Sequence, residues 1–94
     1  MTTTENIIRE KISIIIDILR LILGCSYSDA YNIVINSKMY YYLKQQDYGT
    51  LYDSPQANLS TIGAELREKN IDIGYKITDK AIKQAMLVMM QRNM

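Results

Sequence analysis

The longest regular pattern of hydrophobic and polar positions covers residues 4–23 and predicts a helix. On a helical wheel most polar side chains, with the exception of Lys11, fall within about 100°, which leaves an apolar arc of about 220°. An ordinary surface helix needs a stripe of only roughly 100°, so this helix should be covered on two sides. Either it lies at the centre of the domain, or one side packs against a second chain. Thr4 suits the N-cap, and Gly24 suits a left-handed stop.

The flanks of this first helix supply candidate dimer contacts. Ile14, Ile18 and Leu21 lie on one flank of the apolar arc, and Ile16 and Leu23 lie on the other. A symmetric two-fold contact is the commonest way to bury such a surface. The sequence therefore predicts a homodimer built around the first helix. Which flank faces the core and which faces the partner is left open.

Four further helices are predicted from residues that cap helices. Their starts are Ser26 or Ser28, Ser37, Ser54 followed by Pro55, and Thr78. Apolar positions then recur at helical spacing. On the second helix one side carries Tyr27, Tyr31, Val34, Ile35 and Lys38, and the helix after Ser54 carries a narrow stripe of Leu51, Pro55, Leu59, Ile62 and Leu66. Those expected inside on the other two helices are Met39, Tyr40, Leu43, Ile82, Ala85, Met86, Met89 and Met90.

Two short stretches between these helices have other patterns. Residues 47–50 predict a turn in which Gly49 supplies a positive φ, and 51–53 follow as extended chain. Residues 71–77 alternate apolar and polar, which is a strand pattern. Because a lone strand is not stable, 71–77 either pairs with 51–53 or forms an extended connector. The fold class is all-α: one domain over residues 1–94, a small bundle of about five helices, with that single two-stranded pairing as an option.

Composition excludes several classes of site. The chain of 94 residues has a net charge of +1, one cysteine and no histidine. A histidine-based catalytic triad, a histidine-ligated zinc site and an internal disulfide are therefore excluded. Glu65 and Glu68 are expected on a solvated helix face, and Cys25 has no histidine to activate it. We expect no catalytic residues, no cofactor and no bound metal.

The apolar part of the first helix does not predict a membrane span. Asp17 and Arg20 interrupt it, and a span needs roughly 20 apolar residues. The start of the chain also lacks the basic residues of a secretory signal. We expect a cytoplasmic protein without a membrane partner.

The eight tyrosines are the most unusual feature of the composition. Most are expected to fill a core that has no tryptophan or phenylalanine. Tyr41 and Tyr42 are exceptions, because Tyr40 already takes the inward position of their helix. Tyrosine combines a large contact area with a polar tip and is enriched at interfaces. The predicted partner-binding residues are Tyr41, Tyr42, Tyr48 and Tyr52.

The C-terminal part of the chain is basic. Lys76, Lys80 and Lys83 are spaced four and three residues apart, and Arg92 follows. Such a face beside exposed tyrosines can bind nucleic acid through phosphate contacts and stacking. The alternative interpretation is an ordinary solvated helix face.

Residues 29–65 carry a pattern of the type AY…NSK-x-Y…L…L-x-x-SP, seen here in residues 29–31, 36–40, 43 and 51–55. In this the chain resembles a group of small uncharacterised bacterial accessory proteins, some of them in toxin–antitoxin or mobile-element settings. The resemblance implies an antitoxin-like or accessory binding role and no active site. The amino-acid composition is rich in isoleucine, lysine, asparagine and tyrosine, which are encoded by AT-rich codons. This composition indicates an AT-rich bacterial or phage gene.

Two function hypotheses follow. The first is a non-enzymatic protein-interaction module that binds and modulates another protein, as an antitoxin or inhibitor does. The alternative is a small nucleic-acid-binding regulator that uses the basic C-terminal face. A continuous basic stripe would favour the regulator, and a mixed surface would favour the interaction module.

Overall fold

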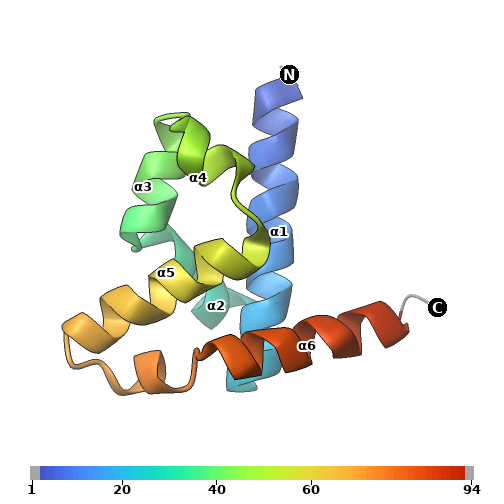
Figure 1. Cartoon of the computed structure of the whole chain (residues 1–94), viewed down its shortest axis with the longest axis vertical. Helices are drawn as coiled ribbons and strands as arrows, with labels where there is room; N and C mark the ends of the chain where they lie inside the picture. The colour runs from blue at the N-terminus through green and yellow to red at the C-terminus, as the bar shows by residue number, and fades with distance from the viewer. Residues whose placement is uncertain (1–2, 93–94) are drawn as a thin grey trace.

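The computed structural model describes residues 3–92, apart from the side chain of Tyr48. Helix α1 (Thr3–Leu23) spans the height of the domain, and the remaining helices pack around it (Figure 1). Its neighbours are α2 (Tyr27–Ile35), α5 (Pro55–Glu68) and α6 (Asp79–Arg92). The shorter elements are α3 (Lys38–Lys44), α4 (Tyr48–Tyr52) and the 3₁₀ turn η1 (Asp72–Tyr75).

The predicted all-α fold class is confirmed. Over residues 3–92 the chain forms α-helices and one 3₁₀ turn, and no strand. Five of the helices have seven residues or more, as the hydrophobic pattern predicted. The sixth, α4, has five residues and was not predicted.

Local capping fixes the helix starts. The hydroxyls of Ser26, Ser37 and Ser54 each accept a backbone N–H three residues further on, at 3.1 Å. Thr78 does the same before α6, from Ala81 at 3.1 Å. These caps satisfy N–H groups that have no partner inside the helix. The predicted cap at Thr4 is wrong, because that residue lies within α1.

The helix ends and turns also differ in part from prediction. Gly24 has the predicted left-handed φ of 63°. The positive φ expected at Gly49 lies instead at Gln46, with a φ of 58°. The reason is that the Asp47 carboxylate accepts the N–H of Thr50 at 3.0 Å and caps α4, so that Gly49 is helical. Residues 51 and 52 are therefore helical rather than extended.

The optional pairing of 51–53 with 71–77 does not form. Residues 72–75 turn as η1, and the backbone carbonyls of Gly74 and Ile77 accept hydrogen bonds from the Arg67 guanidinium, at 2.8 and 3.0 Å. These contacts hold the connector against α5. They replace the ladder hydrogen bonds that a strand would have needed.

Close approach between α5 and this connector depends on two glycines. A Cβ atom at Gly63 would lie 2.5 Å from the carbonyl oxygen of Ile77. A Cβ atom at Gly74 would lie 2.7 Å from the backbone nitrogen of Arg67. In both cases the obstacle is backbone, which cannot rotate away as a side chain can. Glycine is therefore required where the two segments meet.

The core contains aliphatic side chains from every long helix. Ile15, Ile16, Ile18 and Leu19 of α1 are at most 1% exposed. They are covered by α2 on one side and by α5 and α6 on the other (Figure 1). The apolar sides of α1 are therefore covered within one chain, while its polar face lies at the surface. Met90 is a correction: predicted to be buried, it is 62% exposed, because α6 extends past α1.

The glycine contact gives a stability prediction with an unusual sign. Glycine to alanine inside a helix ordinarily stabilises it by up to about 1 kcal/mol. Gly63→Ala should instead lower the free energy of unfolding by about 1–3 kcal/mol, because the new methyl group displaces the Ile77 backbone. Urea unfolding followed by circular dichroism measures this.

Gly49→Ala in α4 is the matched control, because its Cβ would meet only the far end of the Asp47 side chain, at 3.2 Å. It should leave stability unchanged or slightly higher. Equal stability of the two variants would contradict the close approach of α5 and the connector.

Candidate functional site

The tyrosines lie on the surface. Among the seven whose side chains the structure describes, the exposed ones are Tyr27, Tyr31, Tyr41, Tyr42, Tyr52 and Tyr75. Tyr40 is half-buried and packs against the core. The expectation that most tyrosines fill the core is therefore wrong, because isoleucine and leucine side chains fill it instead.

Two exposed tyrosines of α2 form one aromatic surface. Tyr27 and Tyr31 are one helical turn apart, and their rings stack with centroids 6.3 Å apart and planes at 16°. Together with Tyr40 they line a hollow beside the N-terminal half of α1. Arg9 and Lys44 line the same hollow. The sequence analysis grouped Tyr27 and Tyr31 on one side of their helix with Val34, because helical spacing does not say which residues of that side face the solvent.

A second aromatic pair lies on α3. Tyr41 and Tyr42 are exposed, as predicted, and their rings meet edge to face with centroids 5.5 Å apart. Tyr40 takes the inward position between α1 and α3, which leaves its two neighbours outside. Of the other two predicted partner-binding residues, Tyr52 on α4 is exposed. The side chain of Tyr48 lies outside the described residues.

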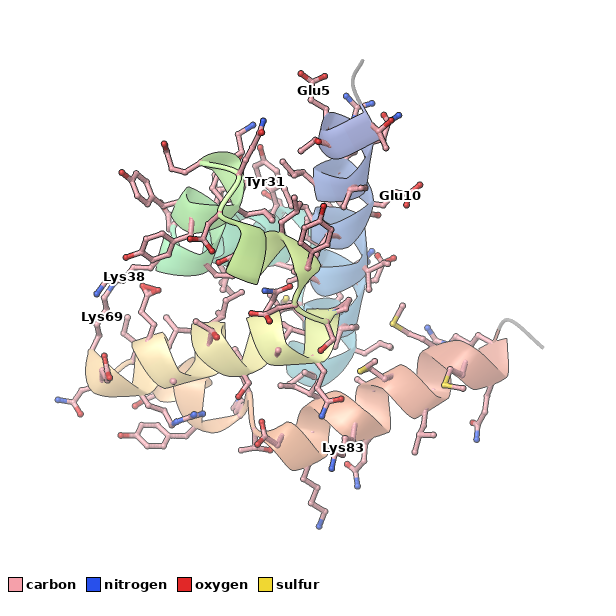
Figure 2. All side chains as sticks on the ribbon, turned by 45° about the horizontal axis from the view of Figure 1, so that its top comes forward. Glu5, Glu10, Tyr31, Lys38, Lys69 and Lys83 are labelled. Carbon is pink, nitrogen blue, oxygen red and sulfur yellow. The ribbon has the colours of Figure 1, made fainter. Side chains whose placement is uncertain are left out.

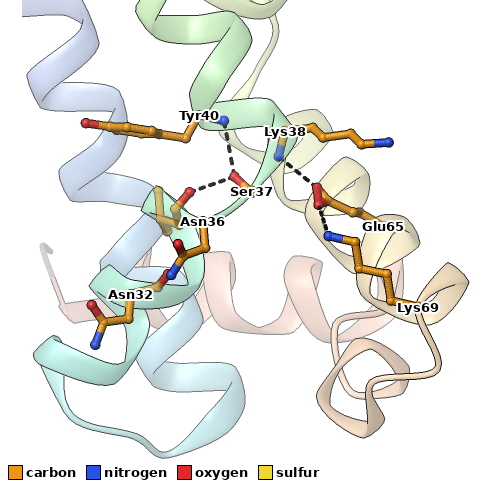
Figure 3. A network of polar contacts seen from close by, with 8 residues as sticks. Asn32, Asn36, Ser37, Lys38, Tyr40, Glu65 and Lys69 are labelled. Carbon is orange, nitrogen blue, oxygen red and sulfur yellow. Dashed lines mark hydrogen bonds and ion pairs between the residues drawn. The ribbon is translucent and has the colours of Figure 1, made fainter.

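A buried carboxylate fixes α3 on α5. Glu65 accepts the backbone N–H of Lys38 at 2.8 Å and the ammonium of Lys69 at 3.1 Å (Figure 3). Ser37, next to Lys38, accepts the N–H of Tyr40 and donates to the carbonyl of Val34. The helix that carries Tyr41 and Tyr42 is thus held by its first turn.

The environment of Glu65 corrects the sequence prediction. Glu65 was expected on a solvated face, but its side chain is buried. Burial by itself would raise the pKa of this carboxyl, yet the hydrogen bonds from Lys38 and Lys69 and their positive charges outweigh it and lower the pKa. A carboxyl held ionised in this way is a poor general acid, which supports a structural role.

Lys11 is the second buried charge. It interrupted the apolar arc of the first helix in the sequence, and its side chain lies inside the domain. Its ammonium donates to the Asp53 carbonyl, to Asn58 Oδ1 at 3.1 Å and to the Thr50 carbonyl at 3.4 Å. Burial lowers the pKa of Lys11, and the Asp53 carboxylate partly opposes this. The lysine joins α1 to the segment between α4 and α5.

The predicted dimer residues have different environments. Ile16 and Ile18 are 0% and 1% exposed within a single chain, and Leu21 and Leu23 are half-buried. Ile14, 40% exposed, is the most accessible of the five. The two sides of the apolar arc are covered largely by helices of the same chain. The homodimer stays a prediction, and Ile14 and Leu21 are the members of the set that a second chain can reach.

The basic residues do not form one continuous stripe. Lys76, Lys80, Lys83 and Arg92 are all exposed. Arg92, however, lines a hollow with Asp17 and Arg20 at the edge of α6 that packs against α1. The tyrosine pairs of α2 and α3 lie elsewhere, as the labelled Tyr31 and Lys83 show (Figure 2). The surface near Arg92 is therefore mixed in charge, and the lysines are separate from the stacked tyrosines.

Other kinds of site find no support in the part of the chain that the structure describes. No group of three or more cysteine, aspartate or glutamate side chains there could hold a metal ion. No helix within residues 3–92 is long and apolar enough to cross a membrane. No family model, curated protein or solved structure matches the chain.

The Glu65 contacts predict how stability depends on pH. Because the pKa of Glu65 in the folded protein lies below the ordinary value of 4.5, its stabilising contribution is complete above pH 4.5. That contribution is lost as the pH falls through the folded-state pKa. Glu65→Gln should lower the free energy of unfolding at pH 7 by about 1–2 kcal/mol and flatten its acid decline. Urea titrations across this pH range measure both effects.

The control is Glu68→Gln, one turn further along α5, where the side chain is exposed. It should change neither the stability at pH 7 nor the acid decline. An unchanged acid decline in Glu65→Gln would show that this carboxylate does not brace α3.

Proposed function

We propose that this protein is a non-enzymatic interaction module that binds and modulates another protein through the exposed tyrosines of α2 and α3. The observation that carries the proposal is that six of the seven described tyrosine side chains are exposed to solvent. Exposed apolar groups that lie together on the surface of a soluble protein mark interaction sites. Tyrosine is also among the residues that dominate binding energy at protein interfaces.

The arrangement of the rings supports recognition of a folded surface. Tyr27 stacks on Tyr31, and Tyr41 meets Tyr42 edge to face, so each ring limits the motion of its neighbour. A side chain that is already ordered loses less conformational entropy on binding. The bracing of α3 through Glu65 acts in the same direction.

Lys11 and Glu65 are two groups whose pKa is lowered, and their surroundings agree with a binding role. Lys11 and Glu65 both direct their charged atoms at partners inside the domain. Each is thus occupied by structural hydrogen bonds. The antitoxin-like or inhibitor-like character, the bacterial or phage origin and the cytoplasmic location rest on the sequence pattern and composition described above.

The alternative function is a nucleic-acid-binding regulator. Its support is the exposure of Lys76, Lys80 and Lys83 at one end of the domain. Tyr75 is the exposed tyrosine next to them in sequence. Three phosphate contacts give weak, salt-sensitive binding with little specificity. The interaction module is therefore the better-supported function.

The tyrosine surface is tested by substitution. Proteins recovered on the immobilised wild type are compared with those recovered on Tyr41→Ala/Tyr42→Ala and on Tyr27→Ala/Tyr31→Ala. A protein lost on at least one tyrosine variant is then purified, and its affinity is measured by calorimetry. Each hot-spot tyrosine should weaken binding by on the order of 2 kcal/mol when truncated.

Lys80→Gln/Lys83→Gln is the control, and it should bind the same protein as the wild type does. Far-UV circular dichroism should show unchanged helicity in every variant. Partner affinity equal to that of the wild type in both tyrosine variants would contradict the proposal. A tight, sequence-selective mobility shift with nucleic acid would favour the alternative function.

A further inference from the structure

The outer face of α1 carries a stripe that lies mostly at the surface, with only Leu21 packed at its end against the core of the same chain. Glu10, Ile14, Asp17 and Leu21 are spaced four, three and four residues apart, which aligns them along one side of the helix. Glu10 and Asp17 are exposed, Ile14 is 40% exposed and Leu21 is half-buried. We call these four residues the α1 stripe. It alternates acidic and apolar side chains.

The outer face of α6 carries a second stripe. Lys80, Lys83, Leu87 and Met90 are spaced three, four and three residues apart and are all exposed. Leu87 is 57% exposed and Met90 is 62% exposed, on the half of α6 that extends past α1 (Figure 1). We call these four residues the α6 stripe. It combines two ammonium groups with two large apolar side chains.

The two stripes have complementary chemistry. Each has two apolar side chains and two charges, and the charges of the α1 stripe are opposite to those of the α6 stripe. The spacing of both stripes is the one by which helices pack side by side at a shallow angle. Pairing of like stripes would place charges of the same sign together, which is unfavourable.

Within one chain the stripes cannot meet. Helix α6 packs on α1 through Ile82 and Ala85, which are buried. Lys83 and Leu87 lie on the other side of the same helix and point away from α1, as Lys83 does in Figure 2. A contact between the two stripes therefore requires two molecules.

We propose that the protein associates with itself, the α6 stripe of one protomer packing on the α1 stripe of its partner. In a two-fold dimer both contacts form at once, because the α6 stripe of each protomer packs on the α1 stripe of the other. Without that closure the contact repeats head to tail and extends beyond two copies. Salt weakens it, since its charges lie at the surface. This contact is separate from the tyrosine surfaces and uses Ile14 and Leu21, two members of the predicted dimer set.

Charge reversal tests the contact. Sedimentation velocity of the wild type should show a mass that rises above that of the monomer between low and high micromolar concentration. Glu10→Lys/Asp17→Lys and Lys80→Glu/Lys83→Glu should each weaken self-association by on the order of tenfold or more, because each places like charges across the contact. An equimolar mixture of the two variants should associate again, since opposite charges then face each other at every contact.

Glu68→Lys/Asp72→Lys is the matched control, because it changes the net charge as the first variant does, at exposed positions away from both stripes. It should associate like the wild type. A wild type that stays monomeric at high micromolar concentration would overturn the proposal. So would a mixture of the two reversed variants that stays monomeric while each retains wild-type helicity.

Discussion

The wide apolar face of α1 is the constraint on which the rest of the structure depends. Ile15, Ile16, Ile18 and Leu19 must leave water together, and burying each large aliphatic side chain contributes roughly 1.5–3 kcal/mol. In a chain of 94 residues, the shorter helices that follow α1 must cover that face. Helix α2 covers one side, and α5 and α6 cover the other, so these elements are used for the core. Six of the tyrosines and the far end of α6 remain at the surface.

The short helices persist because polar contacts attach them to this framework. Helices of five and seven residues, such as α4 and α3, are not stable alone. Glu65 holds the first turn of α3, and Lys11 holds the chain where α4 leads into α5. The aromatic pair on α3 is therefore presented by a buried carboxylate on another helix. In this way the covering of α1 leaves the aromatic pair of α3 exposed, which is part of the surface proposed to bind a partner.

Much of the fold could be predicted because short-range sequence patterns determine where its helices begin and which residues they contain. The caps at Ser26, Ser37 and Ser54 act over three residues, and the long helix has its own periodicity. The errors concern contacts between distant residues. Residues 71–77 alternate like a strand, but Arg67 binds their carbonyls, and a solvated face was expected for Glu65 before α3 was known to rest on it. Exposure of Tyr41 and Tyr42 followed from Tyr40, whereas Tyr27 and Tyr31 have helical spacing that fits either side of a helix.

The most direct test of this account compares two isoleucines one turn apart on α1. Ile18 is 1% exposed beneath the covering helices, and Ile14 is 40% exposed. Chemical unfolding at low protein concentration should show that Ile18→Ala lowers the free energy of unfolding by about 2–5 kcal/mol. Ile14→Ala should lower it by less than about 1 kcal/mol. Similar losses in the two variants, or a larger loss for Ile14→Ala, would contradict the burial of the Ile18 side of α1 beneath the other helices.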